Sequence, residues 1–324
     1  MVEVGGTDVG AALEAHRREL VVHCYRMLGS VHDAEDLAQE TLVRAWTARD
    51  RYDEGRASLR TWLYRIATNA CLTALESRSR RPLPSGLGPP GTDPDVALTP
   101  DLEVPWLQPV PARLLDLGTD PQARAAERDS VRLALVAALQ LLPARQRAVL
   151  LLRDVLEFAA AEVAGQLGTT VAGVNSALQR ARATLAAALP AEAGLRAPDD
   201  PAVAATVERF VAAFEAADVA AIVALLTDDV VLEMPPVPLW FAGRTDYGRF
   251  MERVFRIRGT GWRCVPTTAN GQPALVAYCP DTDGVLRLHT LQVLTVRTDG
   301  IARNVVFQDP AVFALFALPP VLEG

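Results

Sequence analysis

The chain has 324 residues, half of them apolar, so it is long enough for two or three domains that each bury a core. It contains no uninterrupted apolar run of about 18 residues, and residues 1–10 lack a basic segment, which argues against a membrane span and a signal peptide. The four cysteines are far apart and form no C-x-x-C pair. The sequence therefore predicts free thiols in a reducing cytoplasm and no metal site.

The net charge of −7 is distributed unevenly. Residues 11–81 hold 12 arginines against 10 acidic residues, and residues 127–190 hold 7 against 5, so both blocks are mildly basic. Residues 82–126 and 191–324 carry the acidic excess. The negative total therefore does not exclude contact with DNA, because the two basic blocks are separate from the acidic ones.

Residues 33–46 are the first predicted helix with a distinctive face. Small and apolar residues recur at spacings of three and four and predict one buried stripe: Ala34, Leu37, Ala38, Thr41, Leu42 and Ala45. The opposite face is polar and holds Asp36, Gln39, Glu40, Val43 and Arg44. Ser30, three residues before Asp33, is the predicted N-cap. Periodicity alone is also compatible with an ordinary amphipathic helix.

A polar loop over residues 51–58 leads into a second predicted helix, residues 59–71. Aromatic and basic side chains are interleaved along this helix: Arg60, Trp62, Tyr64 and Arg65. Flat side chains stack on exposed bases, each worth roughly 1–3 kcal/mol, while cations hold the phosphate backbone. This pattern favours binding to an opened nucleic acid duplex. The alternative is that Trp62 packs in the core together with Ile66.

Residues 82–121 differ from the helical blocks in composition. They contain ten prolines, with glycines and acidic residues between them. Such a segment does not bury enough apolar surface to order itself, so it is predicted to be a linker. Trp106 is the exception, since a tryptophan in a linker often marks a docking point.

Residues 122–190 are again predicted to be helical. A turn over residues 168–170 separates a helix over 158–167 from one over 171–185, which is the pattern of a helix-turn-helix. The residues predicted to pack inward are Val171, Val174, Leu178, Ala181 and Leu185. The residues predicted to face DNA bases or phosphates are Ala172, Asn175, Ser176, Gln179, Arg180 and Arg182. A plain three-helix bundle is the alternative interpretation.

These helical blocks resemble the sigma-70 family of RNA polymerase sigma factors. The string DAEDLAQETLVRAW resembles the helix that binds core polymerase, and TWLYRIATNAC resembles the block that recognises and opens the −10 element. The helix-turn-helix, with LPARQR before it, resembles the region that reads the −35 element. Two such blocks around a short linker resemble the extracytoplasmic-function group. The resemblance implies core RNA polymerase and promoter DNA as partners, with no catalytic residue and no cofactor.

The resemblance also implies roles for individual residues. Contacts with core polymerase are expected from Asp33, Asp36, Gln39, Glu40 and Arg44. Contacts with the −10 element are expected from Arg56, Ser58, Arg60, Trp62, Tyr64, Arg65 and Asn69. The outward residues of the helix-turn-helix are expected at the −35 element. A basic residue is usual in the family where Asn175 and Ala177 stand, which predicts weaker attraction to phosphate here. In sigma factors of this group the linker threads toward the polymerase cleft, which implies such a role for Trp106.

Residues 202–318 have a different pattern, with two amphipathic helices followed by strands. Asn270-Gly271, Asp283-Gly284 and Asp299-Gly300 are typical hairpin turns and predict an α+β domain with a curved antiparallel sheet. The strings VERFVAAFEAADVAAIVALLTDDVVLEMPP and FAGRTDYGRFM resemble SnoaL-like domains of the nuclear-transport-factor-2-like fold. That fold is a cone with an apolar pocket and serves both enzymes and binding modules.

Polar and aromatic residues of this domain are candidates for lining the pocket: Glu233, Met234, Trp240, Phe241, Tyr278, His289 and Asp309. His289 with Asp309 or Glu233 would form the acid–base pair that an isomerase or hydrolase needs. Each of these residues is isolated in the sequence, so a ligand-sensing or protein-contacting role is the alternative.

The predicted organisation is two all-α domains, residues 11–81 and 122–190, joined by the linker 82–121 and followed by an α+β cone over 202–318. The predicted function is an alternative sigma factor of the cytoplasm, not an enzyme and not membrane-bound. Its activity would be modulated by a small-molecule ligand or an intramolecular contact at the C-terminal domain. Two alternatives are a one-component regulator that does not join polymerase and a SnoaL-like enzyme with a DNA-binding appendage.

Overall fold

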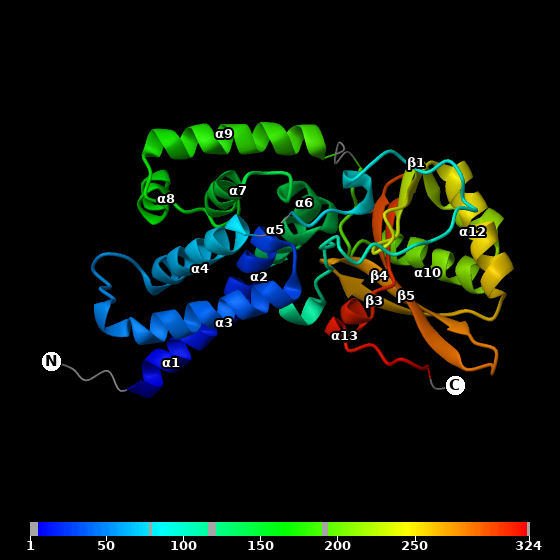
Figure 1. Ribbon diagram of the computed structural model, residues 1–324, viewed down its shortest axis with the longest axis horizontal. Helices are drawn as coiled ribbons and strands as arrows, with labels where there is room; N and C mark the ends of the chain where they lie inside the picture. The colour runs from blue at the N-terminus through cyan, green and yellow to red at the C-terminus, as the bar shows by residue number, and fades with distance from the viewer. Residues whose placement is uncertain (1–5, 78–79, 116–120, 190–193, 323–324) are drawn as a thin grey trace. The chain divides into compact units, whose positions relative to one another are not determined.

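The computed structural model describes residues 6–77, 80–115, 121–189 and 194–322 (Figure 1). The chain divides into two compact units. The helical unit comprises residues 1–81 and 113–190, and the C-terminal unit comprises residues 82–112 and 191–324. Among the described residues, no helix combines the length and the hydropathy needed to cross a membrane.

The first half of the helical unit contains α1 (Gly6–Ala15), α2 (Arg17–Leu28), α3 (Val31–Thr47), the short η1 (Arg49–Arg51) and α4 (Leu59–Glu76). The Ser30 side chain accepts a hydrogen bond from the Asp33 backbone N–H at 3.2 Å, so the predicted cap of α3 is confirmed. The predicted stripe of α3 is buried except for Leu37, which is half-buried. The polar face of α3 is exposed, as predicted.

The second half contains α5 (Pro121–Val131), α6 (Leu133–Leu139), α7 (Ala144–Leu150), a π-helical turn η4 (Leu151–Val155), α8 (Ala160–Leu167) and α9 (Val171–Ala188). Gly168 adopts φ +61° after α8, and Thr170 caps α9 by accepting the Gly173 N–H at 3.0 Å. The helix-turn-helix is therefore confirmed. The prediction that Val171 packs inward is wrong, because Val171 is the first residue of α9 and the buried face begins at Val174.

Two buried arginines tie the halves of the helical unit together. Arg147 of α7 donates to the carbonyls of Met27 and Leu142, and burial lowers its pKa to about 10. Arg26 of α2 donates to the Ser130 hydroxyl in α5. Hydrogen bonds to oxygens compensate the Arg147 guanidinium, and Arg26 also lies 3.8 Å from the Glu127 carboxylate. A buried cation without such partners would be strongly destabilising.

The C-terminal unit is built on a six-stranded sheet in the order β2-β1-β6-β5-β4-β3. Its strands are β1 (Leu226–Glu233), β2 (Trp240–Ala242), β3 (Arg263–Ala269), β4 (Gln272–Pro280), β5 (Leu286–Arg297) and β6 (Gly300–Phe307). Its helices are α10 (Pro201–Glu215), α11 (Val219–Ala224), α12 (Arg244–Arg258) and α13 (Pro310–Leu315). Aromatic side chains fill the core between helices and sheet. They are Phe210 and Phe214 of α10, Phe250 of α12 and Trp262, which directly precedes β3.

The prediction of an antiparallel sheet is wrong for one strand pair, since β1 and β6 run parallel. A parallel pair needs a long crossover, and α12 with β3, β4 and β5 supplies it. The hairpin turns are where the sequence predicts them. Asn270 and Gly271, for example, adopt φ +54° and +64° between β3 and β4.

Residues 82–112, hereafter the strap, are ordered on the C-terminal domain, so the prediction that this segment does not order itself is wrong. The Ser85 N–H donates to the Glu233 carboxylate at 2.9 Å, and the Gly91 N–H donates to the Trp240 carbonyl at 2.7 Å. At the far end, Val110 exchanges two hydrogen bonds with Asn270, at 2.8 and 2.9 Å. Residues 116–120 of the predicted linker lie outside the described residues.

The physical reason is that the strap orders on a surface that another part of the chain provides. Its apolar residues Leu83, Leu107 and Val110 are buried, although the segment forms no core of its own. Its prolines restrict the unbound conformations, so docking costs less conformational entropy than it would for a flexible chain. Composition alone therefore underestimated what the segment can bury.

Candidate nucleic-acid interface and C-terminal cavity

The exposed face of α3 is the first candidate surface. Asp36, Gln39 and Glu40 are exposed, and Glu40 is paired with Arg44 one turn later. Asp33 differs from the other predicted residues of this face, since it forms an ion pair with Arg81 at 2.8 Å. The face thus presents acidic and amide groups with little apolar surface apart from Val43 and Trp46.

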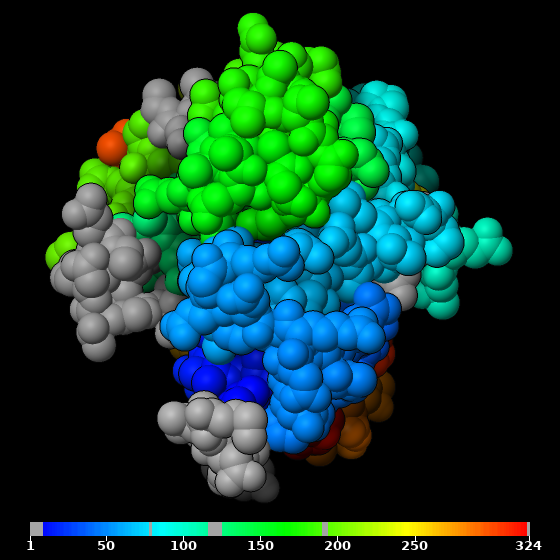
Figure 2. Space-filling view, turned by 90° about the vertical axis from the view of Figure 1, so that its left-hand side faces the viewer, coloured from blue at the N-terminus to red at the C-terminus, as the bar shows by residue number. Residues whose placement is uncertain are grey.

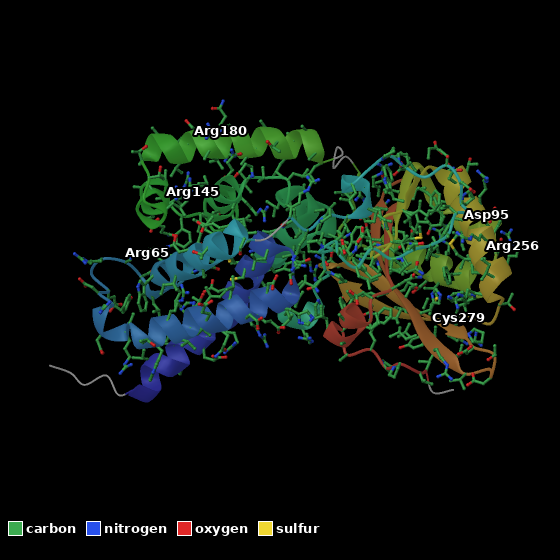
Figure 3. All side chains as sticks on the ribbon, viewed as in Figure 1. Arg65, Asp95, Arg145, Arg180, Arg256 and Cys279 are labelled. Carbon is green, nitrogen blue, oxygen red and sulfur yellow. The ribbon has the colours of Figure 1, made fainter. Side chains whose placement is uncertain are left out.

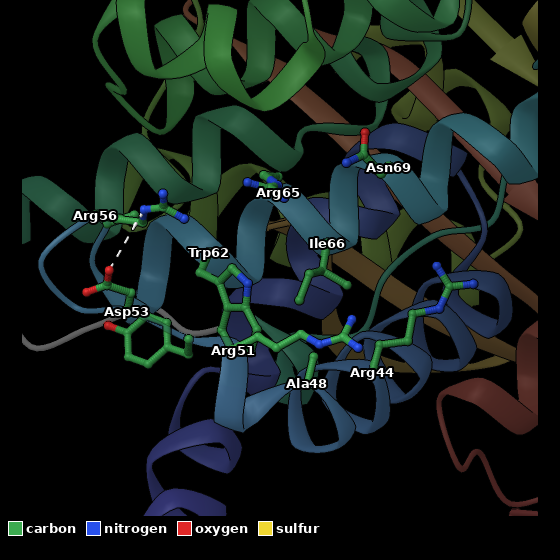
Figure 4. A pocket seen from close by; sticks show the side chains of 11 residues that line it. Arg44, Ala48, Arg51, Asp53, Arg56, Trp62, Arg65, Ile66 and Asn69 are labelled. Atoms are coloured by element: carbon green, nitrogen blue, oxygen red, sulfur yellow. Dashed lines mark ion pairs between the residues drawn. The ribbon is translucent and has the colours of Figure 1, made fainter.

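A cavity of about 490 Å³ lies between the 51–58 loop and α4 (Figure 4). Its basic walls are Arg44, Arg51, Arg56 and Arg65. Its aromatic wall is a stacked pair, Tyr52 on Trp62, with ring centroids 5.1 Å apart and planes inclined by 30°. Ile66 and Asn69 complete the apolar and amide surface. The cavity combines a π-face, an amide, four cations and the Asp53 carboxylate, which pairs with Arg56 at 3.8 Å, within one short stretch of chain.

Of the residues predicted to meet the −10 element, Arg56, Trp62, Arg65 and Asn69 line this cavity. Ser58 does not, because its side chain caps α4 by accepting the Thr61 N–H at 3.1 Å. Arg51 and Tyr52 were missed, and Arg44 was assigned to polymerase binding. The sequence signal that could have identified them is the position of Tyr52 between a basic and an acidic residue of the loop.

Arg60 and Tyr64, also predicted to meet the −10 element, are engaged inside the helical unit. The Arg60 guanidinium and the Tyr64 hydroxyl both donate to the Glu19 carboxylate at 3.0 Å. Phe158 packs against both, edge-on to Tyr64 at 5.6 Å and under Arg60 at 5.4 Å. Burial, followed by the charge of Glu19, raises the pKa of Tyr64. These two side chains therefore hold α2, α4 and the start of the helix-turn-helix together.

A buried histidine lies beneath this cluster. His23 is fully buried, and its Nε2 lies 3.0 Å from the Thr68 hydroxyl. Burial, with the charges of Arg26 and Arg60, lowers its pKa to about 3. His23 is therefore neutral at physiological pH and belongs to the packing of the unit rather than to a metal site. No group of three or more metal-ligating side chains is found among the described residues.

The outer face of α9 is the second part of the nucleic-acid interface. The helix-turn-helix and the 51–58 loop are exposed on the same face of the helical unit (Figure 2). The side chains Ala172, Asn175, Ser176, Gln179 and Arg180 are exposed, and Arg180 points away from the unit (Figure 3). Arg182 is also exposed, but its guanidinium makes a two-pronged ion pair with Asp154 at 2.7 and 2.8 Å. Arg182 therefore braces α9 against η4.

The C-terminal unit contains a second cavity, of about 300 Å³, between α12 and the sheet. His289 and Met234 line it, as predicted, but Glu233, Trp240, Tyr278 and Asp309 do not. Glu233 is buried in an ion pair with Arg303 at 2.8 Å, and Trp240 donates to the Gly88 carbonyl of the strap at 2.9 Å.

The remaining predicted residues also have structural partners. The Tyr278 hydroxyl donates to the Pro319 carbonyl at 3.1 Å, and Asp309 caps α13 through the Ala311 N–H at 2.8 Å. The acid–base pairs predicted for catalysis are therefore not assembled around the cavity. Burial, with the charge of Arg258, lowers the pKa of His289 to about 4, so the imidazole is neutral near pH 7.

A polar ladder that sequence reasoning missed forms one wall of this cavity. The Asn304 amide donates to the Tyr247 hydroxyl and to Gln292, each at 2.9 Å. Gln292 in turn donates to the Thr290 hydroxyl at 3.3 Å. The Asn304 Oδ1 is buried and has no hydrogen-bond partner among the described residues. The alternation of Thr290, Gln292 and Leu294 along β5 was the only signal in the sequence.

Comparison with known proteins agrees with both units. Family models for sigma-70 region 2, sigma-70 region 4 and a SnoaL-like domain match residues 12–81, 132–185 and 207–304. The chain is 48% identical over 317 residues to the ECF RNA polymerase sigma factor SigG of Mycobacterium tuberculosis, across 97% of this chain and 85% of that protein. It is 33% identical over 219 residues to SigJ of the same organism, across 67% of this chain and 62% of that protein.

A solved structure extends the agreement to the fold. The crystal structure of M. tuberculosis SigJ matches with a TM-score of 0.65 and 26% identity, covering 95% of this chain and 99% of that one. The relatives are sigma factors, so the alternative of a one-component regulator that does not join polymerase is not supported. The chain belongs to the extracytoplasmic-function sigma factors of RNA polymerase.

Proposed function

We propose that this sigma factor binds core RNA polymerase through the exposed face of α3, opens the −10 element with the cavity of the helical unit, and reads the −35 element with α9. Its C-terminal domain would modulate that activity. The observation that carries the proposal is the cavity itself, in which four arginines surround a stacked aromatic pair.

The cavity suits a nucleotide that has left the duplex. Arginine side chains neutralise the phosphates of the strand, and an aromatic face stacks on its base. Asn69 offers the hydrogen-bonding groups needed to distinguish one base edge from another. Trp62 is half-buried, stacks on Tyr52 and lines the cavity, so it is not part of the buried core of the helical unit.

The outer face of α9 suits the major groove. Asn175 and Gln179 carry amides that pair with adenine, and Arg180 carries a guanidinium for guanine or phosphate. Because Asn175 and Ala177 are uncharged, we expect recognition to depend more on hydrogen bonds and less on phosphate attraction than is usual in the family.

We assign the C-terminal domain a binding role rather than a catalytic one. Glu233 is committed to Arg303 and the strap, and Asp309 to the start of α13, so neither supports His289 as a general base. The strap connects the two promoter-reading parts of the chain, so a domain that holds the strap is placed to influence initiation.

Run-off transcription with core polymerase tests the polymerase surface. Asp36→Arg reverses a charge on the exposed face of α3 and should weaken core binding and initiation together. Glu103→Arg makes the same change on the exposed part of the strap and is the matched control. A wild-type protein that neither binds core nor initiates, or an Asp36→Arg variant that matches wild type in both assays, would contradict the proposal.

The regulatory role has its own matched pair of variants. A Cβ at Gly91 would lie 2.7 Å from Leu239 Cδ1 and 3.2 Å from Phe241 Cε1, whereas a Cβ at Gly88 meets open space. Gly91→Val should therefore loosen the strap and change run-off output by at least about fivefold, the lower end of typical coupling between sites. Gly88→Val should leave it unchanged. Equal output from both variants and wild type would refute control through the strap.

A further inference from the structure

The C-terminal cavity contains features that packing alone does not require. Its walls are mostly apolar, yet the Asn304 Oδ1 lies buried in one wall without a partner among the described residues. Asn304 is only 1% exposed, and both of its amide protons are used by Tyr247 and Gln292. A buried acceptor that is left unpaired costs about 1–3 kcal/mol, so the site is incomplete as it stands.

We propose that this cavity binds a small aromatic carboxylate that carries a hydroxyl group, and that the bound molecule holds the strap on the C-terminal domain. This inference deepens the regulatory role proposed above and rests on it. It assigns a chemical class to the ligand and a direction to the coupling.

The hydroxyl is required by the polar ladder. Asn304 lines the cavity, and both of its N–H groups are used by partners. Its buried oxygen is therefore the acceptor that this residue leaves for a donor on the ligand. An apolar ligand without a donor would leave this oxygen unpaired and lose the corresponding free energy. His289 contributes no charge, because its imidazole is neutral.

The aromatic body and the carboxylate follow from the other walls. Phe214, Phe250 and Trp262 provide flat apolar surface. Arg253 and Arg258 line the cavity, whereas no aspartate or glutamate among the described residues does so. The walls thus favour an anion over a cation. A volume of about 300 Å³ is at the lower end of the range for ligand pockets, which suits a bicyclic molecule.

The coupling between ligand and strap is inferred from the cavity residues that belong to the strap or contact it. Leu98 of the strap lines the cavity directly. Arg253 lines the cavity and also donates to the strap carbonyls of Pro94 and Val96 at 2.7 and 2.8 Å. Beside it, Arg256 pairs with Asp95 at 2.7 Å (Figure 3).

The cavity exists while the strap is docked, so a ligand does not need to displace it. A bound ligand gains contact with Leu98 only when the strap is in place. Ligand and strap should therefore stabilise each other, by the same factor in both directions.

Calorimetric titration of the full-length protein with 6-hydroxy-2-naphthoate tests the ligand class. We expect binding, about tenfold weaker binding of 6-methoxy-2-naphthoate, which lacks the donor, and about threefold weaker binding of 2-naphthol, which lacks the carboxylate. No binding of 6-hydroxy-2-naphthoate, or equal binding of all three compounds, would overturn the proposal.

Two variants of the strap test the coupling. Leu98→Ala removes the side chain that lines the cavity and should weaken binding of 6-hydroxy-2-naphthoate about fivefold. Leu102→Ala truncates a leucine of the same segment that is 82% exposed, and it should bind like wild type. In hydrogen exchange, saturating ligand should slow the Gly91 and Asp101 amides, which donate to the domain at Trp240 and Pro236. Equal affinities for both variants, or faster exchange with ligand, would overturn the coupling.

Run-off transcription by wild type and the Gly91→Val variant, together with the ligand titration, separates this inference from the proposed function. If wild type initiates and responds to Gly91→Val but does not bind the ligand, only the ligand proposal fails. If the ligand binds as expected but initiation does not depend on the strap, the regulatory role fails.

Discussion

The two units each contain one cavity, and the cavities are built in opposite ways. The cavity of the helical unit is basic and lined by residues from one short stretch of chain. The cavity of the C-terminal unit is mainly apolar, and its polar atoms are buried in a ladder of side chains. The first suits a long anion held by many weak contacts, and the second suits a small molecule with an apolar body. The cavity of the helical unit therefore suits a ligand mainly by charge, and the cavity of the C-terminal unit mainly by shape.

The largest expected contrast concerns acid stability, because each unit holds one neutral histidine, fully buried for His23 and half-buried for His289. The folded-state pKa is about 3 for His23 and about 4 for His289, whereas an unfolded histidine titrates near 6.5. Above pH 6.5 neither contributes to pH dependence. Below it the unfolded chain takes up protons that the folded chain refuses, so stability falls.

For His23 the loss of stability should reach about 3 kcal/mol at pH 4 and continue toward pH 3, whereas for His289 it should end near pH 4. Denaturant unfolding of His23→Gln and His289→Gln between pH 7 and pH 3 measures each contribution. Each variant should show a shallower decline than wild type. Parallel curves for wild type and both variants would mean that neither histidine is held neutral.

The next largest expected contrast is the effect of salt concentration on ligand affinity in the two cavities. If the four arginines of the first cavity each neutralise one phosphate, the affinity for single-stranded −10 DNA should fall on the order of 50-fold between 50 and 200 mM salt. Binding of an uncharged probe such as 2-naphthol in the second cavity should change little. Fluorescence titration of both ligands in the same buffers checks this. A flat salt response for the DNA would contradict the assignment of the arginines.

Removal of the aromatic wall should reduce promoter melting by a factor comparable to, or smaller than, the salt effect on DNA affinity. Trp62→Ala removes the stacking face, which is worth roughly 1–3 kcal/mol, and should reduce run-off from a duplex promoter about tenfold or more. A template that is already open at the −10 element should be less affected. Circular dichroism controls for lost packing against Tyr52. Equal losses on both templates would point to misfolding rather than to a defect in opening.

The smallest expected contrast is between two arginines of α9. Arg180 is exposed and points outward, while Arg182 is tied to Asp154. Arg180→Ala should weaken binding to a −35 duplex about fivefold, and Arg182→Ala less than that. Gel-shift titration of both variants decides between them. A larger effect of Arg182→Ala would mean that the ion pair breaks when DNA binds.

The elements that could be predicted from sequence are those specified by neighbouring residues. The Ser30 cap, the buried stripe of α3 and the turn before α9 depend on side chains within a few positions of one another. Most of the cavity of the helical unit was predictable for the same reason, since its walls lie between residues 44 and 69.

The C-terminal cavity could not be predicted in this way. Its walls come from residues 98 to 308, and strand register decides which of them face inward. Glu233 and Asp309 are chemically suitable partners for His289, but one pairs across β1 and β6 and the other caps a helix. The order of the strap could not be predicted from its composition for a related reason. It depends on a surface formed by residues more than a hundred positions away in the chain.

The docked strap also changes how the two promoter-reading parts are connected. A free segment of this length would behave as a coil whose ends sample many separations. Because Ser85 and Val110 are both held on folded protein, most of that freedom is already removed. The distance that the chain can span between region 2 and region 4 is then set by a folded domain instead of by polymer statistics. We therefore expect the tolerance for promoters with different spacing between their two elements to depend on the C-terminal domain.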